Sequence, residues 1–152
     1  MRTSSDGEKR KVKSKKHLSP LTVHFLHFTR MEDAMEYRPH RKLDVWKKSM
    51  EFVKHIYEAT NSFPKSEVHG FTSQMRRATI SIPSNLAEGA ARKGTKEFKQ
   101  FLNIAQGSIS ELDTQIELAH MLDYIDLKIY GDLMDKLSTI PKMLFGLSRS
   151  LK

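Results

Sequence analysis

The sequence predicts an all-α protein, arranged as an antiparallel up-down four-helix bundle. Apolar residues recur at steps of three and four positions along four long segments, which is the period of an amphipathic helix. No segment shows the sustained alternation that is typical of a strand. The connections between the segments are short, so consecutive helices are expected to run antiparallel. A chain of 152 residues is long enough for one domain with a single modest core.

The first helix is expected over about residues 42–62. Five apolar residues at helical spacing form its predicted core stripe: Leu43, Trp46, Met50, Val53 and Tyr57. Trp46 is therefore interpreted as a core residue rather than as a platform for stacking. Phe52 and Ile56 widen the stripe, and Pro64 ends the helix because proline disfavours helical geometry in the residue before it.

Three further helices follow. The second is expected to begin near Ser66, with that serine as its N-cap and Glu67 near the positive end of the helix dipole. It ends at about residues 92–94, where basic residues precede a glycine. The third keeps an apolar seam for about seven turns. The fourth begins near Asp126, and Pro141 is expected to kink it.

The segment RRATISIPSNLAEGAARKG, residues 76–94, combines helical spacing with a proline and two glycines. Pro83 cannot donate a hydrogen bond to the carbonyl of Thr79, and its ring crowds that turn. A continuous but bent helix is therefore expected. The hydroxyls of Ser81 and Ser84 flank the proline and can bond the freed backbone carbonyls.

Polar and small residues around this proline predict tight packing and an internal polar network. Asn85 falls on the apolar seam and must find hydrogen-bond partners there, and Glu88 is a candidate to reach another helix. Gly89 permits close approach of a neighbouring helix, and the pair Gly107-Ser108 is expected to do the same on the third helix. The predicted structural motif consists of Ser81, Pro83, Ser84, Asn85, Glu88 and Gly89.

Several helices carry more apolar residues than one core stripe needs. The third helix, for example, adds Leu102, Ile104 and Leu118 to its seam. One bundle core does not consume all of that surface, so the surplus favours self-association. The chain is therefore expected to form a homo-oligomer.

Positive charge is unevenly distributed along the chain. The formal net charge is +8, and residues 1–16 contain seven Lys or Arg against two acids. Residues 1–37 are interpreted as a basic, disordered N-terminal extension that precedes the bundle of residues 38–152. An alternative is that this lysine-rich arm contacts nucleic acid. Met31 and Met35 offer alternative starts within it.

The sequence offers little that is typical of an enzyme. It contains no cysteine, which excludes disulfides, thiolate zinc sites and a cysteine nucleophile and is compatible with a reducing cytoplasm. It has no glycine-rich phosphate loop, nucleophile elbow or HExxH motif. Glu117 and His120 have the Glu-x-x-His spacing of di-iron bundles, but those sites need a second such pair, which is missing. We expect a non-enzymatic, cytoplasmic protein without a metal or cofactor.

Two groups of basic residues flank the predicted helices, one at the start of the first helix and one around the connection between the second and third. In an up-down bundle both places lie at the same end, where they would form one basic pole suited to a phosphate backbone. The alternative is an ordinary solvated end whose cations stabilise a helix C-terminus. Arg76 and Arg77 point roughly 100° apart, so at least one faces solvent, an acid or a partner. The nucleic-acid-binding candidates are His40, Arg41, Lys42, Lys47, Lys48, Arg76, Arg77, Arg92, Lys93, Lys96 and Lys99.

Three stretches of the chain resemble a known family: LDVWKKSMEFVKHIY, GFTSQMRRATISIPSNLAEGAARK and EFKQFLNIAQGSISELDTQIELA. They are similar to the bacterial four-helix-bundle proteins encoded in intervening sequences of 23S ribosomal RNA genes, many of which are ribosomal proteins in name only. The resemblance covers about residues 38–150 and implies a four-helix bundle that assembles into a homopentamer. The fold is also similar to that of the accessory protein of diversity-generating retroelements, a basic pentamer that works with a reverse transcriptase and binds nucleic acid.

These observations lead to three functional hypotheses. The first is an accessory protein that binds the backbone of RNA or DNA, without sequence-specific readout because no reading motif is present. The second is a protein-interaction scaffold, for example an accessory subunit of a retroelement reverse transcriptase. The third and weakest is a metal-dependent bundle enzyme.

Overall fold

The computed structural model describes residues 38–151, which form one compact unit. These residues form four α-helices and two short 3₁₀ helices, with no strand among them, and confirm the all-α prediction. In chain order the elements are η1 (Pro39–Lys42), α2 (Asp44–Thr60), η2 (Lys65–Glu67), α3 (Phe71–Ala90), α4 (Thr95–Met121) and α5 (Leu127–Ser150). The extension expected over residues 1–37 lies outside the described residues.

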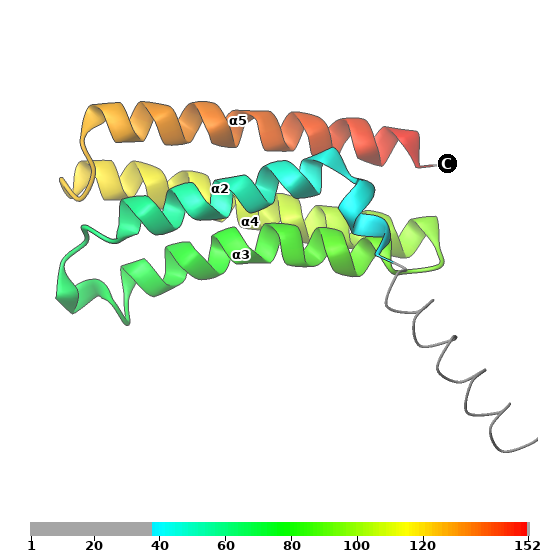
Figure 1. Cartoon of the computed structure of the whole chain (residues 1–152), viewed down its shortest axis with the longest axis horizontal. Coiled ribbons are helices and arrows are strands. Elements are labelled where there is room, and N and C mark those ends of the chain that lie inside the picture. The colour runs from blue at the N-terminus through cyan, green and yellow to red at the C-terminus, as the bar shows by residue number, and fades with distance from the viewer. Residues whose placement is uncertain (1–37, 152) are drawn as a thin grey trace, which may run out of the picture. The chain divides into compact units, whose positions relative to one another are not determined.

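The four α-helices lie side by side, with α2 and α4 each packed against both α3 and α5 (Figure 1). The α2–α3 connection, which contains η2, and the α4–α5 turn lie at one end, which we name the η2 end (Figure 1). η1, the α3–α4 connection and the last turn of α5 lie at the opposite end, which we name the η1 end (Figure 1). Within residues 38–151, every helix is too short or too polar to cross a lipid bilayer.

The core is built from large apolar side chains that all four helices contribute. The most completely buried of these are Phe52, Ile56, Met75, Ile82, Leu86, Leu112, Ile116 and Ile140. Each such side chain contributes about 1.5–3 kcal/mol through removal of its apolar surface from water. Burial of these stripes, rather than helix propensity, holds the helices together.

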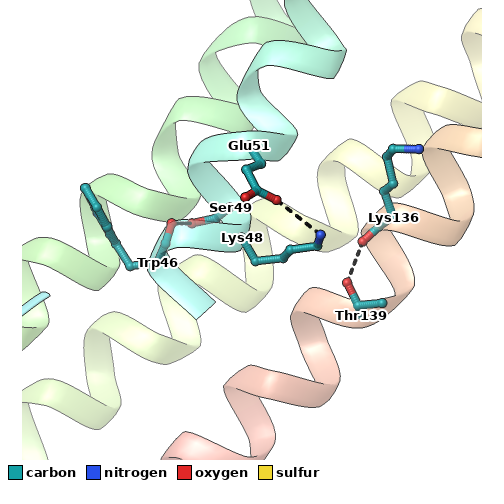
Figure 2. Close-up of polar contacts among 6 residues, drawn as sticks. All are labelled: Trp46, Lys48, Ser49, Glu51, Lys136 and Thr139. Carbon is teal, nitrogen blue, oxygen red and sulfur yellow. Dashed lines mark hydrogen bonds and ion pairs between the residues drawn. The ribbon is translucent and has the colours of Figure 1, made fainter. Parts of the chain in front are cut away.

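The buried face of α2 matches the predicted one only in part: Phe52 and Ile56, expected at the edge of the stripe, form its centre. Its core row consists of Val45, Ser49, Phe52, Ile56 and Ala59. The predicted row lies one residue further along, so Met50 and Tyr57 keep 43% and 36% of their surface exposed and Trp46 is only half-buried. Ser49 obscured the true row, because a serine interrupts an apolar pattern. Its hydroxyl is satisfied in the core by donating to the carbonyl of Trp46 at 2.8 Å (Figure 2).

The two predicted helix starts have different outcomes. Asp126 is the N-cap of α5, and its carboxylate accepts a hydrogen bond from the amide of Ile129 at 2.7 Å. The predicted start at Ser66 is wrong, because Ser66 lies in η2 and α3 begins at Phe71. Glu67 nevertheless stabilises that start from outside the helix, since its Oε2 accepts from the Phe71 amide at 3.1 Å.

The proline-containing segment is continuous helix, as predicted, and Pro83 is buried inside α3. The bend at this proline stays a prediction. A polar network also exists there: Asn85 donates to the carbonyl of Ser81 at 2.8 Å and to its hydroxyl at 3.0 Å. Ser108 of α4 donates to the same hydroxyl at 2.8 Å. The assignment of Glu88 to this network is wrong, because its carboxylate pairs with Arg92, which follows the end of α3.

The two glycines that are predicted to allow close helix approach have different surroundings. A Cβ atom on Gly89 would lie 2.5 Å from Cδ2 of Phe98 and 2.8 Å from Cβ of Phe101, both on α4. Gly89 therefore confirms the prediction. A Cβ atom on Gly107 would meet nothing within 4 Å, so the same prediction for Gly107 is wrong. Ser108, the other member of the predicted pair, does contact α3, through its hydrogen bond to Ser81.

Candidate nucleic-acid interface

Both predicted basic groups lie at the η1 end. The first group occupies η1, which contacts α2 and α3, and the first turns of α2. The second occupies the connection between α3 and α4 and the first turns of α4, which lie at the same end (Figure 1). We use the name basic pole for His40, Arg41, Lys42, Lys47, Lys48, Arg92, Lys93, Lys96 and Lys99.

Three cations of the basic pole are paired with acids three or four residues away in the sequence. The pairs are Lys47 with Asp44 (2.8 Å), Lys48 with Glu51 (3.2 Å, Figure 2) and Arg92 with Glu88. Lys47 lowers the pKa of the Asp44 carboxyl, first by donating a hydrogen bond to it and second through its charge. Exposed pairs of this kind contribute at most about 1 kcal/mol each. A phosphate can therefore replace the carboxylate at little cost.

Other cations of the basic pole form no ion pair among residues 38–151. Arg41 and Lys42 of η1, Lys93 of the connection and Lys96 of α4 are all exposed and unpaired within that range. These four charges come from two segments that are far apart in the sequence. The fold thus gathers accessible positive charge that the linear sequence separates.

The η2 end carries the opposite charge. Its acidic residues are Glu58, Glu67, Glu117, Asp123, Asp126 and Asp132. Among the described residues, the cations at that end include Lys65, Lys128 and Arg76, which donates to Thr60 and Asn61, and the six acids outnumber them. Arg76, a predicted nucleic-acid contact, therefore lies away from the basic pole. The unit is therefore polarised along its helices, and a polyanion is attracted to the η1 end and repelled from the η2 end.

Comparison with known proteins identifies the family. The family model described as 23S rRNA-intervening sequence protein matches residues 41–146. The chain belongs to this family. The resemblance inferred from the sequence is thereby confirmed. No curated protein matches the chain.

A solved structure has the same fold as this family member. It is the crystal structure of a protein with unknown function from the S23 ribosomal protein family of Bacteroides thetaiotaomicron VPI-5482. The two chains are 24% identical with a TM-score of 0.64, and the match covers 69% of this chain and 95% of that chain.

The adjacent arginines of α3 have different surroundings in this 23S rRNA-intervening sequence protein. Arg76 is half-buried: its Nε donates to the Thr60 hydroxyl at 2.9 Å and its Nη2 to the Asn61 side-chain oxygen at 3.0 Å. The Arg76 guanidinium also lies 4.4 Å from the centroid of the Tyr57 ring. Arg76 therefore ties the C-terminus of α2 to α3. Arg77 is exposed and lines a polar cavity of about 250 Å³ between α3 and α4.

Replacing Arg76 by lysine is expected to destabilise the fold by about 1–2 kcal/mol. A lysine ammonium lacks the planar fork that donates to Thr60 and Asn61 at the same time. Chemical denaturation followed by circular dichroism measures the change. Arg77→Lys is the matched control and is expected to change the free energy of unfolding by less than about 0.5 kcal/mol. Equal effects of the two substitutions would contradict the assigned role.

The predicted acid and histidine pair of α4 contacts a tyrosine. The Tyr130 hydroxyl donates to Glu117 at 2.6 Å, and the rings of Tyr130 and His120 stack with their centroids 4.8 Å apart. The hydrogen bond to Glu117 raises the pKa of Tyr130 above its ordinary value of 10.0, and burial and the negative charges of Glu117 and Asp113 add to the rise. Within the described residues, no three His, Asp or Glu side chains converge as metal ligands would.

This raised pKa makes a prediction for alkaline pH. The contribution of Tyr130 to stability is complete below its unfolded pKa of about 10 and is lost as the pH rises through the higher folded value. We therefore expect the free energy of unfolding to fall more steeply above pH 10 in the wild type than in Tyr130→Phe. Urea titrations at a series of alkaline pH values measure both slopes. Parallel slopes would contradict the assignment.

Sequence reasoning missed a cation and an aromatic residue near the basic pole. Arg149 lies in the last turn of α5, at the η1 end, and its guanidinium is 5.7 Å from the centroid of the Phe145 ring. Phe145 is 66% exposed. The position of Arg149 could have been predicted, because in an up-down arrangement the fourth helix ends where the first begins. The exposure of Phe145 could not be predicted, because its position in the apolar pattern does not show whether another helix covers it.

Proposed function

We propose that this chain is an up-down four-helix bundle that assembles into a cytoplasmic homopentamer and binds the backbone of RNA or DNA, without catalysing a reaction. The observation that carries this proposal is the gathering of exposed, unpaired cations from two distant segments at the η1 end. Positive charge without a base-reading motif favours phosphate contacts that do not depend on sequence.

The exposed apolar residues support the oligomer. Ile104, Leu118 and Phe145 each keep between 41% and 66% of their surface exposed. Monomeric soluble proteins rarely expose large contiguous apolar patches, and interfaces between subunits use them. A five-fold arrangement with parallel helices would join five basic poles into a ring. Such a ring binds one polyanion through several copies at once, which raises the affinity above that of one pole.

The test is binding of a labelled RNA and of a DNA of the same sequence, followed by fluorescence anisotropy as salt is raised. We expect binding to both. For each tenfold rise in salt concentration, log10 of the association constant should fall by roughly 0.7–0.9 per phosphate contact. Light scattering is expected to give the mass of five 17.6 kDa chains. Absence of binding at low salt, or binding that salt does not weaken, would reject the proposal.

The protein-interaction scaffold stays a prediction, and the same preparation tests it. Affinity purification from cells, with and without nuclease, separates the two functions. A protein partner such as a reverse transcriptase that remains bound after nuclease treatment would favour the scaffold over the nucleic-acid-binding protein.

A further inference from the structure

An apolar groove runs along the outside of α2 and α3. Its volume is about 300 Å³, and Trp46, Met50 and Val53 of α2 face Ile80 and Pro83 of α3 across it. Met50 and Ile80 are 43% and 41% exposed, so the groove is open to solvent. Trp46, Met50 and Val53 belong to the row of α2 that the sequence assigned to the core. Its volume is at the lower limit of pockets that hold a small organic ligand, roughly 300–1,000 Å³.

The groove begins beside the basic pole. Trp46 lies in the first turn of α2, and its ring centroid is 4.9 Å from that of His40 in η1, with the two planes tilted by 60°. Arg41 and Lys42 follow His40 in the same 3₁₀ helix, and Lys47 follows Trp46 in α2. The contact with His40 thus sets η1, a segment of the basic pole, against one wall of the groove, and the rest of the groove is lined mainly by apolar side chains.

We infer that this groove binds one unpaired nucleobase of a single-stranded nucleic acid whose phosphates contact the basic pole; the inference rests on the proposed function. The planar face of a base stacks on an indole ring, and such stacking tolerates any base because each has a π-face. The Ser84 hydroxyl also lines the groove and can bond a base edge.

A nucleotide matches both halves of this site. Its phosphate complements Arg41 and Lys42, while its base matches the apolar walls. A second copy of the chain would match the apolar walls alone. A duplex cannot use the groove, because its base faces are stacked inside the helix. The site therefore predicts a preference for single strands, which phosphate contacts alone do not provide.

Trp46 is the only tryptophan in the chain, so all tryptophan fluorescence comes from a residue that lines this groove. The experiment titrates the full chain at low salt with a single-stranded oligodeoxynucleotide, with its duplex, and with a strand of equal length that lacks bases. We expect the single strand to quench Trp46 emission and the other two to leave it nearly unchanged. Anisotropy of labelled copies gives the affinities in parallel.

Two variants test the groove itself. Trp46→Ala is expected to weaken single-strand binding about tenfold, the effect of losing one stacked base, and to leave duplex binding within twofold of wild type. Trp46→Phe keeps a stacking surface and is expected to recover most of the loss. Ile80→Ser alters the opposite wall at a half-exposed position and is expected to act like Trp46→Ala while the chain stays folded.

Binding of single strand and duplex with equal affinity and without a change in Trp46 emission would overturn this inference and leave the proposed function intact. Loss of the oligomer in Ile80→Ser, seen by light scattering, would also overturn it, because a second copy would then occupy the groove. No binding of any of the three nucleic acids would reject the proposed function itself.

Discussion

Gly89→Ala is expected to destabilise the fold by about 2 kcal/mol. The added methyl group would lie 2.5 Å from Cδ2 of Phe98 and 2.8 Å from Cβ of Phe101. The Phe98 ring can rotate, but the Cβ of Phe101 moves only with the backbone of α4. The helices must therefore separate at this level, where α3 and α4 pack together. Chemical denaturation measures the loss.

Gly107→Ala is the matched control on the facing helix. Its new methyl group would meet no atom within 4 Å, so the substitution acts through the backbone alone. Alanine is the better helix former by about 0.5–1 kcal/mol, and we expect stabilisation of that size. Opposite signs for the two glycines would support the close approach of α3 and α4. A neutral Gly89→Ala would show that α4 adjusts without cost.

The triple substitution of Arg92, Lys93 and Lys96 by alanine is expected to abolish most nucleic-acid binding under the proposed function. Each phosphate contact that is lost reduces the slope of log affinity against log salt by about 0.7–0.9, so three contacts reduce it by about two to three. The loss should be uniform across sequences, because phosphate contacts carry no sequence information. Anisotropy titrations at several salt concentrations measure the slope.

The matched control removes cations at the η2 end. Lys65 and Lys128 are exposed lysines there, and the double substitution to alanine is expected to leave affinity and slope nearly unchanged. Circular dichroism checks that the triple variant keeps its helices, since Arg92 also contacts the Phe101 ring at 5.0 Å. An equal loss in the control would show that net charge, and not the basic pole, governs binding.

The helices themselves could be predicted because each buries a stripe with a 3.6-residue period. Which stripe is buried could not always be predicted. On α2 the apolar rows through Phe52 and Val53 differ by one residue, and Ser49 made the correct row look interrupted. Packing against α3 and α5 determines which row is buried, and the sequence of α2 alone does not contain that information. Trp46 was assigned to the core for that reason.

The residue at which a helix begins also depends on more than the capping residues near it in the sequence. Ser66 and Glu67 look like the start of a helix, yet they belong to a 3₁₀ turn, and Glu67 accepts from an amide one turn later. For the polar network, Asn85 indicated that partners exist but not which ones. Ser108 is 27 residues away from Ser81, and their contact follows only from the register of α3 against α4.

The opposite charges of the two ends have a consequence for encounter rates. α4 has 27 residues and is therefore about 40 Å long, several times the Debye length of about 8 Å at physiological salt. The two ends hardly sense each other across that length, while a nearby polyanion exerts a torque on the whole molecule. The molecule therefore meets the polyanion with its η1 end foremost. The association rate should depend on the positions of the charges more than on the net charge.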